Sequence, residues 1–375
     1  MAGIYIHIPF CARRCIYCGF FSTSLHGLKD RYVSALCREL ELESDWLGHA
    51  GVDTLYLGGG TPSQLTGQQL ETIMEAVLKY PGTGQMKELT IECNPDDITP
   101  EYVKTVAGLG FNRISMGVQS FDDGMLGFLH RRHSAGQAVK AIETCRSCGI
   151  DNISIDLMYG LPGQDLKMQE SDVRKAVSLG VDHLSSYCLS YEPGSPLARM
   201  KEEGKESQVP EETCADMFSQ LCSILGEWGF EHYEISNFCK KGKRSMHNSS
   251  YWNGTPYLGA GAGAHSFNGK ERHWNPDDLE LYCDSMDNGV ECFQSETLSL
   301  TDRYNEYVML GLRTSDGISA EEIRQMFGQR MHDGFCRNAA PYIRSGQLEQ
   351  AKGRLRIAQD SLFISDSIIS SLFAE

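Results

Sequence analysis

The sequence lacks an excess of basic side chains. Its 34 lysines and arginines stand against 50 acidic residues, which gives a formal net charge of −16. Because an acidic surface repels phosphate backbones, we expect no nucleic-acid partner. The absence of a recognisable RNA-binding module points the same way and disfavours an RNA-modifying enzyme.

Long apolar runs are also missing, and so is a signal peptide. No stretch approaches the roughly 20 apolar residues that span a bilayer. The chain opens instead on Ile4–Ile8, whose pattern predicts a β-strand. We therefore expect a cytoplasmic protein. Its fourteen cysteines fit a reducing compartment, where thiols bind metals or fill cores.

Three of these cysteines, Cys11, Cys15 and Cys18, follow one another as C-x3-C-x2-C. Thiolates are the preferred ligands of iron–sulfur clusters. Three thiolates on a [4Fe–4S] cluster leave one iron free to bind a substrate or cofactor. Zinc is the alternative, but its structural sites usually have four protein ligands, and the nearby His7 lies in the predicted strand. A second pair, Cys145-x2-Cys148, falls on a predicted helix, which favours buried thiols.

Six short β-rich runs alternate with segments whose apolar residues recur at helical spacing. Six such units predict a parallel sheet, either open or closed into a barrel. Glycines at 110, 149, 180 and 229 are expected to end helices, and Thr99-Pro100 to begin one. The strands are expected at Ile4–Ile8, Thr54–Leu57, Leu89–Cys93, Arg113–Met116, Ile153–Leu157 and His183–Tyr187. The helices are expected at Asp30–Leu47, Gly67–Tyr80, Pro100–Leu109, Ala135–Cys148, Lys167–Leu179 and Glu211–Trp228.

Unusual residues fall where these strands end. The cysteine loop follows the first strand, and Gly58-Gly59-Gly60-Thr61-Pro62 follows the second. Glu92, Gln119 and Asp156 lie at or near the ends of the next three. Sites in parallel α/β folds lie at this edge, and glycines let the backbone approach a ligand closely. Taken alone, the glycine run could equally be a tight turn.

The pattern changes after Trp228. We expect a barrel over residues 1–230, a connecting region of strands and loops over 231–300, and a smaller helical domain over 301–375. In this last domain the expected elements are helices at Asp302–Arg313, Ala320–Phe327 and Met331–Ser345, a small hairpin at Leu348–Glu349 and Leu355–Ile357, and a final helix at Ser365–Phe373. Three helices and a hairpin predict a winged-helix-like domain.

The cysteine loop, with Tyr17 before its third cysteine, resembles the signature of the radical S-adenosylmethionine (AdoMet) superfamily. The G-G-G-T-P run resembles that family's motif for the AdoMet amino group, in the variant of the oxygen-independent coproporphyrinogen oxidase branch. The resemblance implies a partial (β/α)6 barrel and a [4Fe–4S] cluster whose open iron is chelated by AdoMet. It also implies cleavage of AdoMet to methionine and a 5′-deoxyadenosyl radical. The residues that it implies around AdoMet are Tyr5, Tyr17, Gly59, Gly60, Thr61, Glu92, Gln119, Arg131 and Asp156.

Further along, His247-Asn-Ser-Ser-Tyr251-Trp252 resembles the H-N-x-x-Y-W signature of the HemW haem chaperones, and the likeness to that branch covers nearly the whole chain. Two features depart from the oxidase: Phe20 stands in place of a further cysteine, and only three residues precede the first strand.

The resemblance implies a protein that carries haem to acceptors such as respiratory proteins. His247 is the candidate iron ligand, with Tyr251 and Trp252 packing on the porphyrin. His265 is a second candidate. A dimer and a peripheral membrane contact are compatible with this role. The alternative function is the oxidase reaction, in which the radical leads to decarboxylation of two propionates of coproporphyrinogen III.

Overall fold

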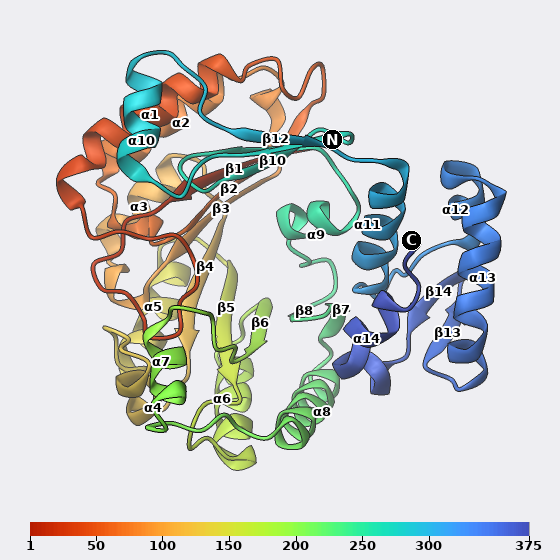
Figure 1. The fold of residues 1–375 in the computed structure, drawn as a ribbon. Helices are drawn as coiled ribbons and strands as arrows, with labels where there is room; N and C mark the ends of the chain where they lie inside the picture. The colour runs from red at the N-terminus through yellow and green to blue at the C-terminus, as the bar shows by residue number, and fades with distance from the viewer. Residues whose placement is uncertain (375) are drawn as a thin grey trace.

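The fold is built around six parallel strands that follow one another in sequence order. The computed structural model describes residues 1–374. The strands are β1 (Ala2–Ile8), β2 (Val52–Gly59), β3 (Glu88–Cys93), β4 (Arg113–Gln119), β5 (Asn152–Tyr159) and β6 (His183–Cys188). Figure 1 shows them curving into an incomplete barrel. This is the partial (β/α)6 architecture that the sequence predicted.

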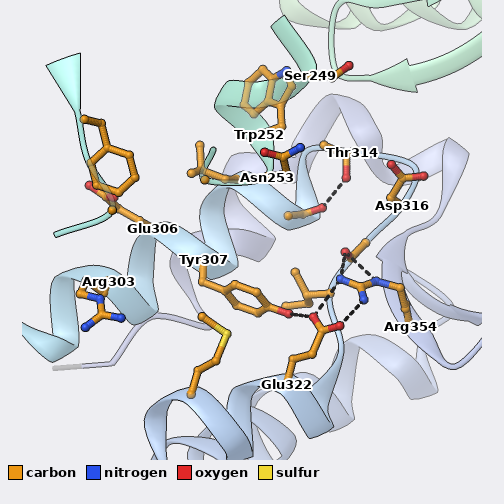
Figure 2. Close-up of a pocket in the computed structure, with 18 of the residues that line it drawn as sticks. Ser249, Trp252, Asn253, Arg303, Glu306, Tyr307, Thr314, Asp316, Glu322 and Arg354 are labelled. Carbon is orange, nitrogen blue, oxygen red and sulfur yellow. Dashed lines mark hydrogen bonds and ion pairs between the residues drawn. The ribbon is translucent and has the colours of Figure 1, made fainter. Parts of the chain in front are cut away.

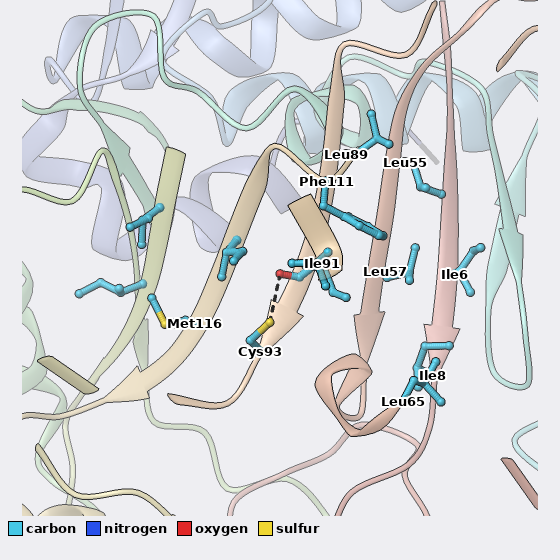
Figure 3. Packing of buried hydrophobic residues seen from close by; sticks show 14 of the residues in the cluster. Ile6, Ile8, Leu55, Leu57, Leu65, Leu89, Ile91, Cys93, Phe111 and Met116 are labelled. Atoms are coloured by element: carbon cyan, nitrogen blue, oxygen red, sulfur yellow. Dashed lines mark hydrogen bonds between the residues drawn. The ribbon is translucent and has the colours of Figure 1, made fainter. Parts of the chain in front are cut away.

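Helices cover the outer face of this sheet (Figure 1). They are α1 (Lys29–Leu42), α2 (Gly67–Lys79), α3 (Pro100–Gly108), α5 (Ala135–Ser147), α6 (Leu166–Ser178) and α8 (Glu211–Glu227), each within a few residues of its expected position. Ile4, Ile6 and Ile8 alternate along β1 and bury their side chains completely in the core beneath the helices. Figure 3 shows this layer of the core.

Several helix ends follow the predicted capping rules. The Thr99 hydroxyl accepts a hydrogen bond from the Tyr102 amide at the start of α3, at 3.1 Å. Gly110, Gly149, Gly180 and Gly229 all have positive φ just beyond helices, as expected of glycines that terminate them. Local sequence signals therefore set the boundaries of these helices.

The region after α8 extends the same sheet at both sides. On one side lie β9 (Tyr257–Ala260), β10 (His265–Phe267), β11 (Glu271–Trp274) and β12 (Gln294–Thr297). On the other lie β8 (Asn237–Cys239) and β7 (Glu231–Glu234). Two helices here, α9 (Met246–Trp252) and α10 (Leu279–Asp287), were not predicted, and neither were α4 (Asp123–Phe128) and α7 (Pro196–Glu202).

Polar side chains line the concave face of the barrel because strand residues alternate between the two faces. Between the buried isoleucines of β1, Tyr5 and His7 point inward; Tyr5 stacks on Tyr56 of β2, with ring centroids 6.1 Å apart. Helix α9 contacts β1 and β2 on this face, and Figure 1 shows it inside the curve of the sheet. The barrel interior is thus a polar column rather than an apolar core.

The C-terminal part forms a second unit with its own core. It contains α11 (Leu300–Leu312), α12 (Ala320–Phe327), α13 (Gln329–Arg344), the hairpin of β13 (Leu348–Ala351) and β14 (Arg354–Ile357), and α14 (Ser365–Ser370). Three helices followed by a hairpin match the expected winged-helix-like order. Within residues 1–374, every helix is too short or too polar to cross a bilayer.

Candidate functional site

The cysteine loop leaves the carboxyl end of β1 and is closed by backbone hydrogen bonds. The Cys11 amide donates to the Thr23 carbonyl at 2.9 Å, and the Thr23 amide donates to the Pro9 carbonyl at 2.7 Å. Ile16 anchors the middle of the loop: its side chain is buried, and its carbonyl accepts from the Leu197 amide at 3.0 Å. The three cysteines are therefore carried on a loop fixed at both ends and at its centre.

Two of the thiols have specific polar partners. The Cys11 sulfur lies 3.3 Å from the Thr61 hydroxyl, and the Cys15 sulfur lies 3.3 Å from an Arg131 guanidinium nitrogen. Burial raises the pKa of the Cys11 and Cys18 thiols. All three cysteines keep part of their surface exposed. The three residues are therefore not sealed in the core.

The chemistry of these three thiols suits an iron–sulfur cluster. Among residues 1–374, no three His, Cys, Asp or Glu side chains converge as ligands of one ion. In a cubane cluster each thiolate binds a different iron, so convergence on one point is not required. Arg131 adds a positive charge beside the cysteine loop, which suits an anionic cluster.

Arg131 is held in place from two strands. One of its terminal nitrogens donates to the Asn94 side-chain oxygen at 2.6 Å and also to the Gly117 carbonyl. Its Nε atom is buried without a partner in the described structure. Gly117 leaves room for this arrangement, because a Cβ there would lie 3.2 Å from the guanidinium. Arg131 therefore joins the ends of β3 and β4 to the cysteine loop.

The glycine turn after β2 packs directly against the start of the cysteine loop. The Gly60 amide donates to the Ile8 carbonyl at 2.9 Å, and a Cβ on Gly60 would lie 2.7 Å from that oxygen. Gly59 has φ of +102°, and a Cβ there would lie 2.3 Å from the His7 ring. Only glycine fits both positions, so the turn forms a close-packed backbone cradle beside Cys11.

Glu92 fixes this turn from the neighbouring strand. Its carboxylate accepts from the Gly59 amide at 3.1 Å and from the Tyr56 hydroxyl at 2.7 Å. Burial raises the pKa of Glu92 to about 7. Tyr5 lies next to this group and donates to, or accepts from, His7 Nδ1 at 3.2 Å. The carboxyl is thus held near its titration point at neutral pH.

Gln119 ends β4, and Asp156 lies on the neighbouring strand β5, three residues before that strand ends. A bulge between Gly117 and Gln119 interrupts the pairing of β4 with β5, and Gln119 has φ of +71°, unusual for a residue with a side chain. Asp156 pairs in register with Gly117, and burial raises its pKa to about 6 despite a hydrogen bond from Ser185. Strain of this kind is concentrated at functional sites.

His247 lies at the opposite edge of the barrel and does not offer a free ring nitrogen. It is fully buried; Nδ1 bonds the Thr54 hydroxyl and Nε2 bonds the Tyr251 hydroxyl, both at 2.9 Å. Glu88, the first residue of β3, accepts from the His247 amide at 2.9 Å. Direct ligation of haem iron by His247, which the sequence suggested, would require one of the two ring hydrogen bonds to break.

His265, the second histidine candidate, is exposed on β10. Its ring stacks on Trp274, with centroids 5.9 Å apart. The structure does not bring it together with His247, which lies on the concave face within a separate aromatic group of Tyr5, Tyr56 and Tyr251.

Three residues at the site, Tyr56, Asn94 and Gly117, were missed by the sequence analysis, and His7 was considered there only in connection with zinc. His7, Tyr56, Asn94 and Gly117 all touch the predicted residues. Their alternation along the strands, which places Tyr5 and His7 on one face, could have indicated His7. Nothing in the local sequence marks Asn94, because its role comes from a contact with Arg131, 37 residues away.

The comparisons with known proteins agree with this geometry. Residues 5–176 match the family model described as the radical SAM superfamily, and residues 298–360 match the HemN C-terminal domain. The structure of coproporphyrinogen III oxidase (HemN) from Escherichia coli superposes with a TM-score of 0.85 at 22% identity, covering 100% of this chain and 90% of that one. The chain is therefore a radical AdoMet protein with the HemN fold, a class whose members hold a [4Fe–4S] cluster and AdoMet.

Relatives of known name identify the family within the radical AdoMet class to which the chain belongs. The heme chaperone HemW of Bacillus subtilis is 31% identical over the full length of both chains. That of Mycobacterium tuberculosis is 32% identical over 99% of this chain and 94% of its own. The mitochondrial radical S-adenosyl methionine domain-containing protein 1 of Bos taurus is 32% identical over 100% and 87%. The chain belongs to the HemW family.

Proposed function

We propose that this protein is a haem chaperone: it binds haem as cargo and passes it to haem-accepting proteins in the cytoplasm or at a membrane surface. The observation that carries the proposal is the full-length likeness to relatives named as haem chaperones. This likeness includes α9, the helix that carries the His247–Trp252 motif and is called the motif helix below, and it includes the C-terminal unit.

We assign the cluster to Cys11, Cys15 and Cys18, with AdoMet bound beside it. When bound, the cluster supplies an electron and an open iron for AdoMet. Arg131 compensates thiolate charge at Cys15, and Thr61 orients the Cys11 sulfur. Gly59 and Gly60 allow close approach of a ligand to the backbone. In this proposal Tyr5, Tyr17, Glu92, Gln119 and Asp156 complete the AdoMet pocket.

We place haem in the region of α9, as the motif suggests. Its acceptors are proposed to be respiratory proteins, and contact with them at a membrane or as a dimer fits this role. The absence of a cysteine at Phe20 favours the chaperone over the oxidase, since the oxidase branch carries a further cysteine there.

One experiment separates the two functions. The protein is reconstituted anaerobically, and one portion is titrated with haem while another is incubated with coproporphyrinogen III, AdoMet and a reductant. We expect a Soret band on titration and no protoporphyrinogen IX. Formation of protoporphyrinogen IX would establish the oxidase, and absence of haem binding would refute the chaperone.

The Cys11→Ala/Cys15→Ala/Cys18→Ala variant serves as the control for cluster content. It should lose the cluster iron and its EPR signal. Full iron content in this variant would refute the assignment of the cluster ligands.

A further inference from the structure

A cavity of about 380 Å³ lies between the motif helix α9 and the C-terminal unit. Its volume falls within the range of small-molecule sites. Trp252 and Phe267 line it from the barrel side, and Tyr307, Met326 and Phe327 line it from the C-terminal side. Figure 2 shows Trp252 above the cavity and Tyr307 across from it. The walls suit a flat apolar ligand.

One cation of the cavity, Arg303, has no acidic partner among residues 1–374. Its three acidic side chains all have cationic partners: Asp316 pairs with Arg244 at 2.9 Å, Glu306 with Arg272 at 2.9 Å, and Glu322 with Arg354 at 2.6 Å. Among residues 1–374, no acidic group lies within ion-pair distance of Arg303.

Arg303 lies on the face of α11 that lines the cavity. Arg303, Tyr307, Leu310 and Gly311 lie on α11 at spacings of four, three and one, so they share one face of the helix. Figure 2 shows Arg303 and Tyr307 emerging from this same helix. An arginine beside an aromatic wall, with no ion-pair partner in the described part of the chain, is a suitable partner for a carboxylate.

The cavity lies at the opposite edge of the sheet from the cysteine loop. Gly254, on its wall, precedes Pro256, whose carbonyl accepts from the Gly3 amide at the beginning of β1. Phe267 pairs with Tyr257, the first residue of β9, which runs parallel to β1. The cysteines instead follow the last residue of β1. The body of the barrel, with His247 and Tyr251, therefore lies between cavity and cluster.

From these observations we infer that the cargo porphyrin of the proposed chaperone lies in this cavity, with its ring against Trp252 and Tyr307 and a propionate on Arg303. This inference rests on the proposed function. It separates the cargo from the AdoMet pocket, so a radical formed there does not reach the porphyrin. None of the lining side chains is a histidine, so this proposal includes no histidine ligand to the iron. Binding in the cavity depends on packing of the porphyrin ring and on the contact between its propionate and Arg303.

The test is a haem titration of the reconstituted protein and of variants with matched controls. Arg303→Glu is paired with Arg337→Glu, an exposed arginine on α13 away from the cavity. Trp252→Ala is paired with Trp228→Ala, an exposed tryptophan at the end of α8. We expect each cavity variant to lose at least fivefold in haem affinity, and each control to match the wild type. Cluster content and AdoMet affinity should not change.

Haem dimethyl ester, which lacks free carboxylates, distinguishes a propionate contact from a structural effect. Arg303→Glu should bind the ester as well as the wild type does. Equal losses for haem and ester would refute the propionate contact. If the wild type binds haem and both cavity variants bind it equally well, the location is wrong while the proposed function stands. If the wild type binds no haem, the proposed function itself fails.

Discussion

Asp156 lies within β5, opposite the bulge that interrupts β4 between Gly117 and Gln119. It pairs in register with Gly117 and faces the side chains around Arg131. Replacing Asp156 with Ala removes a charged acceptor from the proposed AdoMet pocket. The expected loss of binding free energy is about 1–3 kcal/mol, the cost of one charge-assisted hydrogen bond. Asp151→Ala, an exposed change just before the same strand, is the control.

Calorimetry on the reconstituted protein measures this effect. Cluster content has to remain at the wild-type level, since the cysteines lie on another loop. Unchanged AdoMet affinity in Asp156→Ala would remove this residue from the pocket.

Glu92 should make AdoMet binding depend on pH. Burial raises the pKa of Glu92 to about 7 and that of Asp156 to about 6. AdoMet carries a net positive charge and therefore binds better when these carboxyl groups are ionised. At lower pH the carboxyl groups are protonated before binding, and the release of a proton reduces the free energy of AdoMet binding. AdoMet affinity should therefore rise with pH, by about tenfold between pH 6 and 8 for a single group with pKa 7.

Glu92→Gln cannot titrate and provides the comparison. Its AdoMet affinity should be weaker at pH 8 and less sensitive to pH. A wild-type affinity that is constant over this range would show that Glu92 is already ionised in the free protein.

At the scale of elements, α9 illustrates a helix that its own sequence does not favour. The segment Met246–Trp252 contains Asn, two Ser and aromatics, all poor helix formers. Ser245 caps it, and Glu88 of the distant β3 accepts from its first amides. Because tertiary contacts stabilise this helix, the sequence predicted only loops and strands here.

The buried His247 should make the fold sensitive to acid. Burial lowers its pKa from 6.5 to about 3, so below pH 6.5 the unfolded chain takes up a proton that the folded chain does not. The contribution of His247 to the free energy of unfolding is unchanged above pH 6.5. Between pH 6.5 and 3 it falls by about 1.4 kcal/mol per pH unit. At pH 5.5 the expected cost is about 1.4 kcal/mol.

Urea unfolding of cluster-free protein at pH 7.5 and 5.5 tests this, with His247→Gln as the comparison. The variant should be less stable at pH 7.5, because the bonds to Thr54 and Tyr251 are altered. The free energy of unfolding of this variant should fall less between pH 7.5 and 5.5 than that of the wild type. Equal losses would show that His247 is protonated in the folded protein.

The six β/α units were predictable because buried parallel strands give short apolar runs, and glycines mark the helix ends. The cysteine loop and the glycine turn were predictable because their spacing is local. The contact of Arg131 with Cys15 was not, since 116 residues separate them. The strands β10 and β12 were not located individually within the expected region of strands and loops, because strands of three and four residues, with all of β12 exposed, carry almost no periodicity.

At the scale of the whole molecule, the cluster loop and the α9 cavity occupy opposite edges of one sheet. The polar column between them is hydrogen-bonded: the His183 ring lies 2.7 Å from the Ser154 hydroxyl and 2.8 Å from the Tyr233 hydroxyl. The backbone carbonyl of Tyr233 separately accepts from the Ser315 amide of the C-terminal unit at 3.0 Å. Haem and AdoMet in these two places do not touch, so any influence of one on the other has to pass through the protein, and such coupling is reciprocal.

We therefore predict that haem binding does not require the cluster. The Cys11→Ala/Cys15→Ala/Cys18→Ala variant should bind haem within about twofold of the wild type, because a porphyrin in the cavity touches no residue of the cysteine loop. Saturating haem should also leave AdoMet affinity within about twofold, and by reciprocity AdoMet should then change haem affinity by no more than that factor. Titration followed by the Soret band measures haem affinity, and calorimetry measures AdoMet affinity. Competition between haem and AdoMet would place the porphyrin at the carboxyl edge of the barrel, within reach of the cluster, and would favour the oxidase-like arrangement instead.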